Sequence, residues 1–209
     1  GEVIHSAGVM NPQIRFGEDL MSRVSFAMMN KDGTDKLKTA VRESLNELCI
    51  QIVKDCKIDE KQLVEITLVC NPVMHHLLLG INPTELGQAP FALATSDSLY
   101  VNSLELDLTF LGNTKVYILP CIAGHVGADA AAVILSEEPN ESKENVLIID
   151  VGTNAELILG NKNKVLTCSS PTGPAFEGAQ ISSGQRAAPG AIENVRINPK
   201  TKEPVFKVI

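Results

Sequence analysis

With 209 residues, the chain is long enough for one large domain or two small ones with a real hydrophobic core. Hydrophobic residues make up 44% and charged residues 21%, and a net charge of −7 without a long basic run argues against nucleic acid as the main partner. No apolar stretch reaches the roughly 18 residues of a membrane span, and the five cysteines form no CxxC pair. We therefore expect a reduced, cytoplasmic protein that binds no membrane and keeps most of its cysteines in the core.

The first part of the chain alternates between strand-like and helix-like patterns. Residues 2–7 predict a short strand, and Gly17-Glu18-Asp19 predicts the start of a helix, because the helix dipole favours acid in the first turn. Thr34 is expected to cap a second helix that keeps its apolar spacing as far as Cys56. Residues 64–69 then predict a strand.

Asn71 follows that strand and precedes a helix that carries His75 and His76 and ends at Gly80. Adjacent positions on a helix point about 100° apart and do not easily share one metal ion, so we interpret the two histidines as a packing and surface pair. Residues 81–113 are rich in turn residues, and we interpret them as an insertion. A strand over 115–119 then leads through a turn into an alanine-rich helix over 128–135.

The stretch from Val146 to Gly160 is the one around which the chain is organised. Its apolar start predicts a strand buried on both faces, Asp150 stands at the strand's end, and Gly152-Thr153-Asn154 predicts a tight turn in which glycine tolerates a positive φ. The chain then leads back as the second arm of a hairpin. A phosphate needs exposed backbone donors and its magnesium ion needs an oxygen ligand, although an ordinary hairpin with an Asx turn remains an alternative.

After this hairpin the sequence predicts a third strand over 165–168, a helical turn from Phe176 and a hairpin around Asn198-Pro199. Strands alternate with helices, so the predicted class is α/β. The order of strand, small-residue turn, proline and phenylalanine occurs both early and late, which a duplicated unit would explain. We infer an incomplete fold.

Several segments together resemble the ATP-dependent reductive activators of corrinoid proteins, members of the actin, sugar-kinase and heat-shock ATPase superfamily. The similar segments are Asn11-Pro-Gln-Ile-Arg-Phe-Gly-Glu-Asp-Leu-Met-Ser-Arg23, Met74-His-His-Leu-Leu-Leu-Gly80, Leu119-Pro-Cys-Ile-Ala-Gly-His-Val-Gly-Ala-Asp129, Ile149-Asp-Val-Gly-Thr-Asn154 and Gly173-Pro-Ala-Phe-Glu-Gly178. They follow one another in the family's order over nearly the whole chain.

The resemblance implies an RNase-H-like actin and sugar-kinase ATPase fold in which two halves hold ATP and Mg²⁺ between them. Residues 1–144 would form the first half without its initial phosphate hairpin, with the insertion near 81–113. Residues 145–209 would begin the second half. The end of that half is expected to be missing, and the family's [2Fe-2S] cluster is expected on a domain absent from this chain.

By the same resemblance, residues of the second half contact the nucleotide. Asp150 would lie near the metal, Gly152, Thr153 and Asn154 would donate to phosphate oxygens, and the turn of Gly173, Pro174, Glu177 and Gly178 would border adenosine. Asn71 and His125 follow strands of the first half and are candidates for orienting the attacking water. Parallel sheets bind ligands beyond such strand ends.

The function that the resemblance implies is an ATPase that drives the reduction of Co(II) to Co(I) in a partner corrinoid protein of a methyltransferase system. A small-molecule kinase of the same superfamily and a nucleotide-dependent scaffold are the alternatives. This polypeptide alone is expected to bind nucleotide weakly and to perform no redox chemistry. A homodimer is left open.

Overall fold

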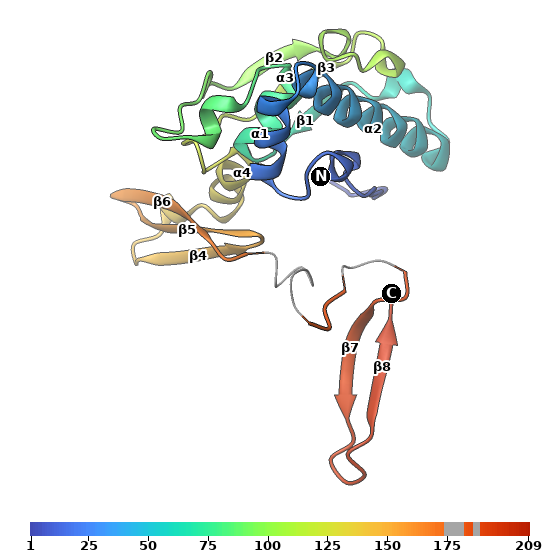
Figure 1. The fold of residues 1–209 in the computed structure, drawn as a ribbon, viewed down its shortest axis with the longest axis vertical. Coiled ribbons are helices and arrows are strands. Elements are labelled where there is room, and N and C mark those ends of the chain that lie inside the picture. The colour runs from blue at the N-terminus through green and yellow to red at the C-terminus, as the bar shows by residue number, and fades with distance from the viewer. Residues whose placement is uncertain (174–181, 186–188) are drawn as a thin grey trace. The chain divides into compact units, whose positions relative to one another are not determined.

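The structure is a computed structural model, and it describes every residue except 174–181 and 186–188. The described residues divide into two compact units, Gly1–Glu138 and Pro139–Ile209, and each is described by itself (Figure 1). The division falls close to the predicted one at 144/145. Helices and strands occur together, which confirms the α/β class.

The first unit combines α-helices with a mixed sheet of strand order β1-β3-β2, in which β1 runs parallel and β2 antiparallel to β3. Its α-helices are α1 (Leu20–Met29), α2 (Gly33–Cys56), α3 (Pro72–Leu79) and α4 (Ala128–Glu137), and its strands are β1 (Glu65–Leu68), β2 (Leu99–Asn102) and β3 (Lys115–Ile118). Its 3₁₀ helices are η1 (Pro12–Arg15), η2 (Glu60–Gln62), η3 (Thr84–Gly87), η4 (Ser103–Leu106) and η5 (Thr109–Leu111).

The core of this unit consists of two clusters of buried aliphatic side chains. One cluster lies where the apolar face of α2 meets the sheet, and its buried members are Leu78, Leu106, Leu108, Leu111, Val116 and Ile118. The other joins α1, α2, α3 and η3 through Val24, Ala27, Leu37, Val73, Leu77 and Leu86. The three- and four-residue spacing of apolar residues along the helices is what brings these side chains to one face.

A buried arginine ties α2 to the end of α3. Arg42 donates from Nε and Nη2 to the carbonyl oxygen of Leu78, at 2.9 and 2.6 Å. Its Nη1 lies 2.6 Å from Oδ2 of Asp107, which is largely exposed. The last carbonyl groups of a helix lack partners within the helix, and this guanidinium supplies one.

Three details of the first unit differ from the sequence predictions. Residues 2–7 form no strand, because none of the described segments pairs with them, and Val3 stays 85% exposed. Thr34 lies inside α2, and the N-cap position belongs to Asp32. The segment 81–113 is more than an insertion, since it supplies β2, which pairs with β3 and closes one edge of the sheet.

Both histidines of α3 are buried, so only the packing part of the expected surface pair is correct. His76 Nδ1 donates to the Pro72 carbonyl at 2.9 Å and its Nε2 accepts from the Ala94 N–H at 3.0 Å, a pattern that requires the neutral ring. Neither ring nitrogen of His75 has a hydrogen-bond partner among the described residues. Burial, reinforced by the neighbouring His76, lowers the pKa of His75 to about 4.

The second unit is built from antiparallel strands. Its elements are η6 (Pro139–Glu141), β4 (Val146–Val151), β5 (Asn154–Asn161), β6 (Lys164–Pro171), β7 (Ile192–Ile197) and β8 (Pro204–Val208). Strands β4, β5 and β6 form a meander and β7 pairs with β8, which confirms both predicted hairpins. The expectation that β4 is buried on both faces is wrong, because its residues Leu147, Ile149 and Val151 are exposed on one face of the meander. On the opposite face of the meander, Ile158 of β5 is buried.

Lowering the pH from 7 to 5 is expected to destabilise the first unit. Unfolded His75 titrates near its ordinary pKa of 6.5, whereas the folded residue stays neutral down to about 4, so the unfolded state gains protons as the pH falls through this window. Between pH 7 and 5 the free energy of unfolding therefore decreases by about 2 kcal/mol at most. His75→Leu removes this contribution and breaks no hydrogen bond among the described residues, so urea denaturation at both pH values should show a flatter profile.

His76→Leu is the matched control, because it deprives the Ala94 N–H of its acceptor and should destabilise the fold by about 1 kcal/mol at pH 7. Equal losses of stability at pH 7 for the two substitutions would contradict the assignment of His75 as the unpartnered residue.

Candidate functional site

The antiparallel ladder of β4 and β5 places Asp150 directly opposite Glu156. Side chains in this relation have Cβ atoms ~5 Å apart, so both carboxylates lie on one face near the tip of the hairpin. Glu156 is opposite Ser169 on β6, and the Ser169 hydroxyl donates to Glu156 Oε1 at 2.9 Å. Asp150 is exposed. This group presents hard carboxylate oxygens, the ligand type that Mg²⁺ prefers.

The end of β6 holds the turn between β4 and β5. Thr172 Oγ1 lies 2.5 Å from the carbonyl oxygen of Gly152 and 3.0 Å from that of Thr153. The backbone N–H groups of Thr172 and Gly173 donate to the Thr153 carbonyl at 3.2 and 2.9 Å. The Gly152 N–H donates to the Asn154 carbonyl at 2.8 Å, so it is already committed within the turn.

The glycine with left-handed backbone is not the one that the sequence indicated. Gly152 does not have a positive φ, whereas Gly173 has a φ of 76° and open space where a Cβ would stand. Only glycine adopts that conformation at little cost, so Gly173 sets the direction in which the chain leaves β6. Of the residues expected to border adenosine, Gly173 is described, whereas Pro174, Glu177 and Gly178 lie outside the described residues.

In the first unit, Asn71 is the N-cap of α3. Its Oδ1 accepts from the Met74 N–H at 2.9 Å. The start of α4 lies beside it, since the Ala128 N–H donates to the Cys70 carbonyl at 2.9 Å and a Cβ on Gly127 would stand 2.7 Å from the Asn71 Cα. Two helix N-termini thus meet beyond the carboxyl ends of β1 and β3, the place predicted from the strand order.

His125 lies in the turn that precedes α4 and is exposed. Its ring packs edge-on against Phe91, with ring centroids 4.5 Å apart. Gly124 makes this contact sterically accessible, because a Cβ there would stand 2.0 Å from the Phe91 carbonyl oxygen. The described contact of His125 is therefore a packing contact with the 81–113 segment. Asp150 belongs to the second unit, whereas Asn71 and His125 belong to the first.

The cysteines are all free thiols, and they differ in exposure. Burial raises the pKa of Cys70 to about 12, with smaller contributions from Cys121 and Asp129, and burial raises that of Cys121 to about 11. Both thiols are therefore protonated at neutral pH, and a protonated cysteine is a poor nucleophile. Cys121 is buried as expected, whereas Cys168 is exposed, because it lies on the uncovered face of the meander opposite Leu157.

Sequence reasoning missed Glu156, Ser169 and Thr172. A signal for Glu156 was present, because a hairpin centred on Thr153 brings residues at equal distances from that centre, such as 150 and 156, opposite one another. Ser169 follows from the same counting across the next turn. Thr172 had no such signal, since its hydroxyl reaches backbone atoms 19 and 20 positions away.

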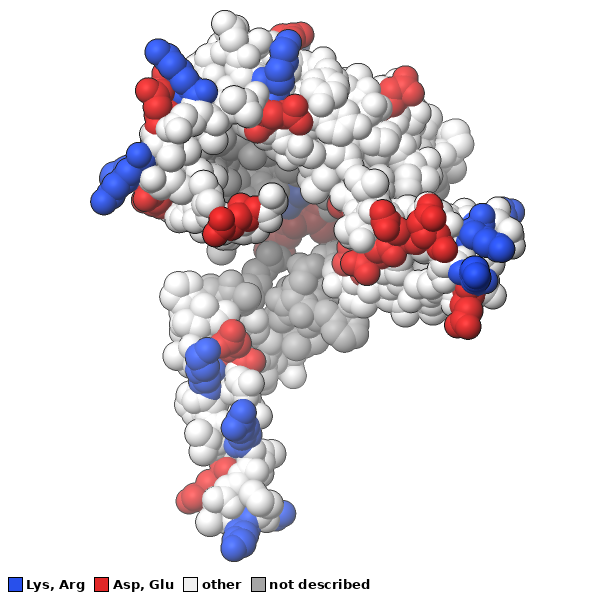
Figure 2. Space-filling view, turned by 180° about the vertical axis from the view of Figure 1, so that it is seen from behind, with Lys and Arg blue, Asp and Glu red and all other residues white. Residues whose placement is uncertain are grey.

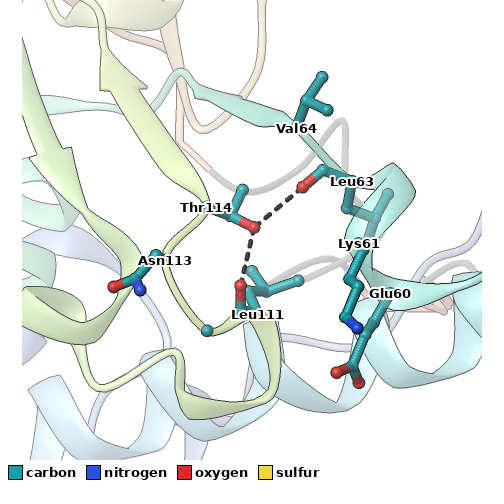
Figure 3. Close-up of a pocket in the computed structure, with 8 residues that line it drawn as sticks. Glu60, Lys61, Leu63, Val64, Leu111, Asn113 and Thr114 are labelled. Atoms are coloured by element: carbon teal, nitrogen blue, oxygen red, sulfur yellow. Dashed lines mark hydrogen bonds between the residues drawn. The ribbon is translucent and has the colours of Figure 1, made fainter.

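A pocket of about 380 Å³ lies in the first unit (Figure 3). Thr114 Oγ1 closes one side of it, 2.9 Å from the Leu63 carbonyl and 2.8 Å from that of Leu111. Its lining consists of Glu60, Lys61, Leu63, Val64, Leu111, Gly112, Asn113 and Thr114. None of the residues predicted from the sequence contributes to it.

On the face seen in Figure 2, lysine and arginine side chains are scattered singly or in small groups among acidic and uncharged ones. Within the described part of the chain, no three histidine, cysteine, aspartate or glutamate side chains are arranged to hold a metal ion. Among the helices of the described residues, none is both long and apolar enough to cross a bilayer.

Comparison with known proteins assigns both parts of the chain. Residues 1–142 match the family model described as the RACo middle region, and residues 144–209 match the C-terminal domain of RACo, the ASKHA domain. The change from one model to the other falls within a few residues of the division into two units.

The names of two similar proteins refer to the activation or reduction of corrinoid proteins. The corrinoid activation enzyme RamQ of Eubacterium limosum is 36% identical over 195 residues, which cover 93% of this chain and 32% of RamQ. The [Co(II) methylated amine-specific corrinoid protein] reductase of Methanosarcina barkeri is 28% identical over 192 residues, covering 86% of this chain and 34% of that protein.

A solved structure of a reductive activator for corrinoid, iron-sulfur protein superposes on 99% of this chain with a TM-score of 0.89 and 35% identity, and the chain covers 33% of it. The chain thus spans about a third of the length of each of these proteins. The resemblance seen in the sequence is confirmed. Because the middle-region match alone covers more than half of the residues, this chain belongs to the RACo family of reductive activators of corrinoid proteins.

Proposed function

We propose that this chain is part of the ATPase domain of an activator that couples ATP hydrolysis to the reduction of Co(II) to Co(I) in a partner corrinoid protein of a methyltransferase system. The observation that carries the proposal is the consecutive match of the chain to the middle and ASKHA regions of RACo. The printed names of the similar proteins, a corrinoid activation enzyme and a Co(II) corrinoid protein reductase, support the choice of partner.

The tip of the β4–β5 hairpin is the part of the second unit that fits a nucleotide. Asp150 would hold Mg²⁺, which neutralises negative charge on the phosphates when bound. The exposed position of Asp150 and the oxygen atoms of Glu156 and Ser169 beside it suit that ion. The Gly152 N–H is used within the turn, and Thr153 and Asn154 stay the residues proposed to contact phosphate.

The remaining predicted residues complete the proposed site. The turn that begins at Gly173 and contains Pro174, Glu177 and Gly178 would border adenosine, with Glu177 accepting from the ribose hydroxyls. Asn71 stays a candidate for orienting water, and its side-chain oxygen is engaged as a helix cap. His125 is the weaker candidate, because its ring packs on Phe91.

In this proposal, ATP hydrolysis drives a conformational cycle, and the cycle makes an unfavourable electron transfer possible. A ligand shifts a conformational equilibrium only by its differential affinity for the two states, so the nucleotide-bound and product-bound forms must differ in affinity for the corrinoid protein. Closure of domains over a nucleotide is a common source of such a difference. The electron itself would come from a [2Fe-2S] cluster on another domain of the protein.

ATP turnover by the intact protein is expected to rise when its corrinoid partner is added in the Co(II) state. The same partner with methylated cobalt is the control and should stimulate less, because it needs no reduction. A coupled assay of ADP release measures both. Turnover that ignores the corrinoid protein but rises with a sugar or an organic acid would favour a small-molecule kinase instead.

Asp150→Asn in the intact protein is expected to lower ATP hydrolysis by orders of magnitude while the melting temperature stays unchanged or rises slightly. Loss of the carboxylate removes the proposed metal ligand, and it also relieves the like-charge pair with Glu156. Glu144→Gln, an exposed carboxylate of the same unit, serves as control and should leave turnover intact. If Asp150→Asn lost both ATP hydrolysis and folding stability, the residue would have a structural role.

Gly173→Ala is expected to weaken ATP binding more than turnover at saturation. An alanine at a φ of 76° costs on the order of 1 kcal/mol, which shifts the turn that joins the phosphate loop to the adenosine side. Gly112→Ala is matched to it, since Gly112 also has a positive φ and open surroundings but lies in the first unit. Isothermal titration with ATP compares the two, and equal losses of affinity would contradict the assignment.

A further inference from the structure

Phe91 has a backbone conformation that its residue type rarely adopts. Its φ is 58°, in the left-handed region, where the Cβ of any residue other than glycine comes too close to the backbone. The other described non-glycine residues with a positive φ are polar and lie at helix ends or in a hairpin turn, and they are Lys57, Asp107, Glu138 and Lys202. Phe91 lies in neither a helix nor a strand, so the end of a helix does not account for its strain.

Burial in the core does not explain the aromatic ring at this position. Phe91 is 37% exposed, and among the described residues it packs into neither of the two core clusters nor into a smaller buried group formed by Leu119, Cys121 and Ala128. Leu93, two residues further on, does pack against one of the core clusters and against that smaller group. Strained residues persist only where the surrounding structure over-determines them, and they cluster at functional sites.

The backbone around Phe91 is held from several sides. The Phe91 N–H donates to the Gln88 carbonyl at 2.7 Å, and the Ala94 N–H donates to Nε2 of the buried His76 at 3.0 Å. The Phe91 carbonyl lies so close to Gly124 that a Cβ at position 124 would collide with its oxygen. Because these contacts fix the chain on both sides of the ring, they also fix the direction in which the ring points.

The ring of Phe91 points at the ring of His125. The two ring centroids are 4.5 Å apart and the planes meet at 62°. His125 is exposed in the turn before α4, and an exposed side chain without such a contact samples several rotamers. No hydrogen bond to either ring nitrogen of His125 comes from the described residues, so both nitrogens are accessible to water or a ligand. The contact with Phe91 therefore orients the imidazole and leaves its polar atoms available.

We propose that Phe91 is a positioning residue for His125. Glycine or asparagine would adopt a φ of 58° at lower cost, so the ring at position 91 is explained by its contact with His125 and not by the backbone. The fixed imidazole holds a ring nitrogen where it orients the water that attacks the γ-phosphate, and its rotational freedom is already lost before the nucleotide binds. The inference rests on the proposed function, in which His125 is a candidate for this role.

The test measures steady-state ATP hydrolysis by the intact protein with substitutions at position 91. Phe91→Asn suits the left-handed backbone but lacks the ring, so kcat is expected to fall about tenfold while the KM for ATP and the melting temperature change little. Phe91→Tyr keeps the ring and should restore the wild-type kcat. Leu104→Asn, which removes another exposed apolar side chain of the 81–113 segment, is the matched control and should leave kcat and KM unchanged. Phe91→Leu, apolar but without a ring, makes the same comparison if Phe91→Asn does not fold.

A double substitution distinguishes a positioning role from an independent one. Phe91→Asn combined with His125→Asn should lower kcat no further than His125→Asn alone, because Phe91 acts through His125. Additive losses, or a wild-type kcat in Phe91→Asn, would overturn the inference even if Asp150→Asn abolishes hydrolysis. A wild-type kcat in His125→Asn would remove His125 from the proposed site and overturn the inference with it. An intact protein that does not hydrolyse ATP would instead overturn the proposed function.

Discussion

The register of β4 on β5 is the constraint on which the candidate site depends. Pairing Val151 with Ala155 leaves a short turn at Gly152-Thr153 and sets Asp150 opposite Glu156. A slip by one residue would move Asp150 to the other face of the meander, among Leu147 and Ile149. Burial of Ile158 on the same face as Asp150 and exposure of the leucines on the other therefore decide where the carboxylate stands.

The same meander explains why the tip of the hairpin is ordered although its carboxylates are alike in charge. Two carboxylates directly opposite each other repel, which disfavours the pairing. The Ser169 hydroxyl donates to Glu156, and the Thr172 hydroxyl and two backbone N–H groups are engaged with the tip, so β6 compensates for the repulsion. A cation bound at Asp150 would relieve it further, which couples the ion to the shape of the loop.

The first unit meets a different constraint, the close approach of two helices. Residues 70 and 71 can lie against the start of α4 only because Gly127 has no side chain, and Asn71 and Asp129 accept hydrogen bonds from the N-terminal amides of their own helices. The strand expected at 2–7 does not form, since no segment in the described part of the chain pairs with it. The local sequence pattern predicted a helix or strand correctly where that element packs against the hydrophobic core.

The amino-acid sequence by itself determined the family, the helices α1 to α4, the hairpins and the position of Asp150 at a strand end, because these follow from local spacing and from short motifs. Only the tertiary structure decided that His75 is buried without a hydrogen-bond partner among the described residues and that the Thr172 hydroxyl contacts the tip of the turn. These contacts join residues up to 20 positions apart or depend on burial. The packing of segments that are distant in the sequence creates them, and no local pattern in the chain encodes that packing.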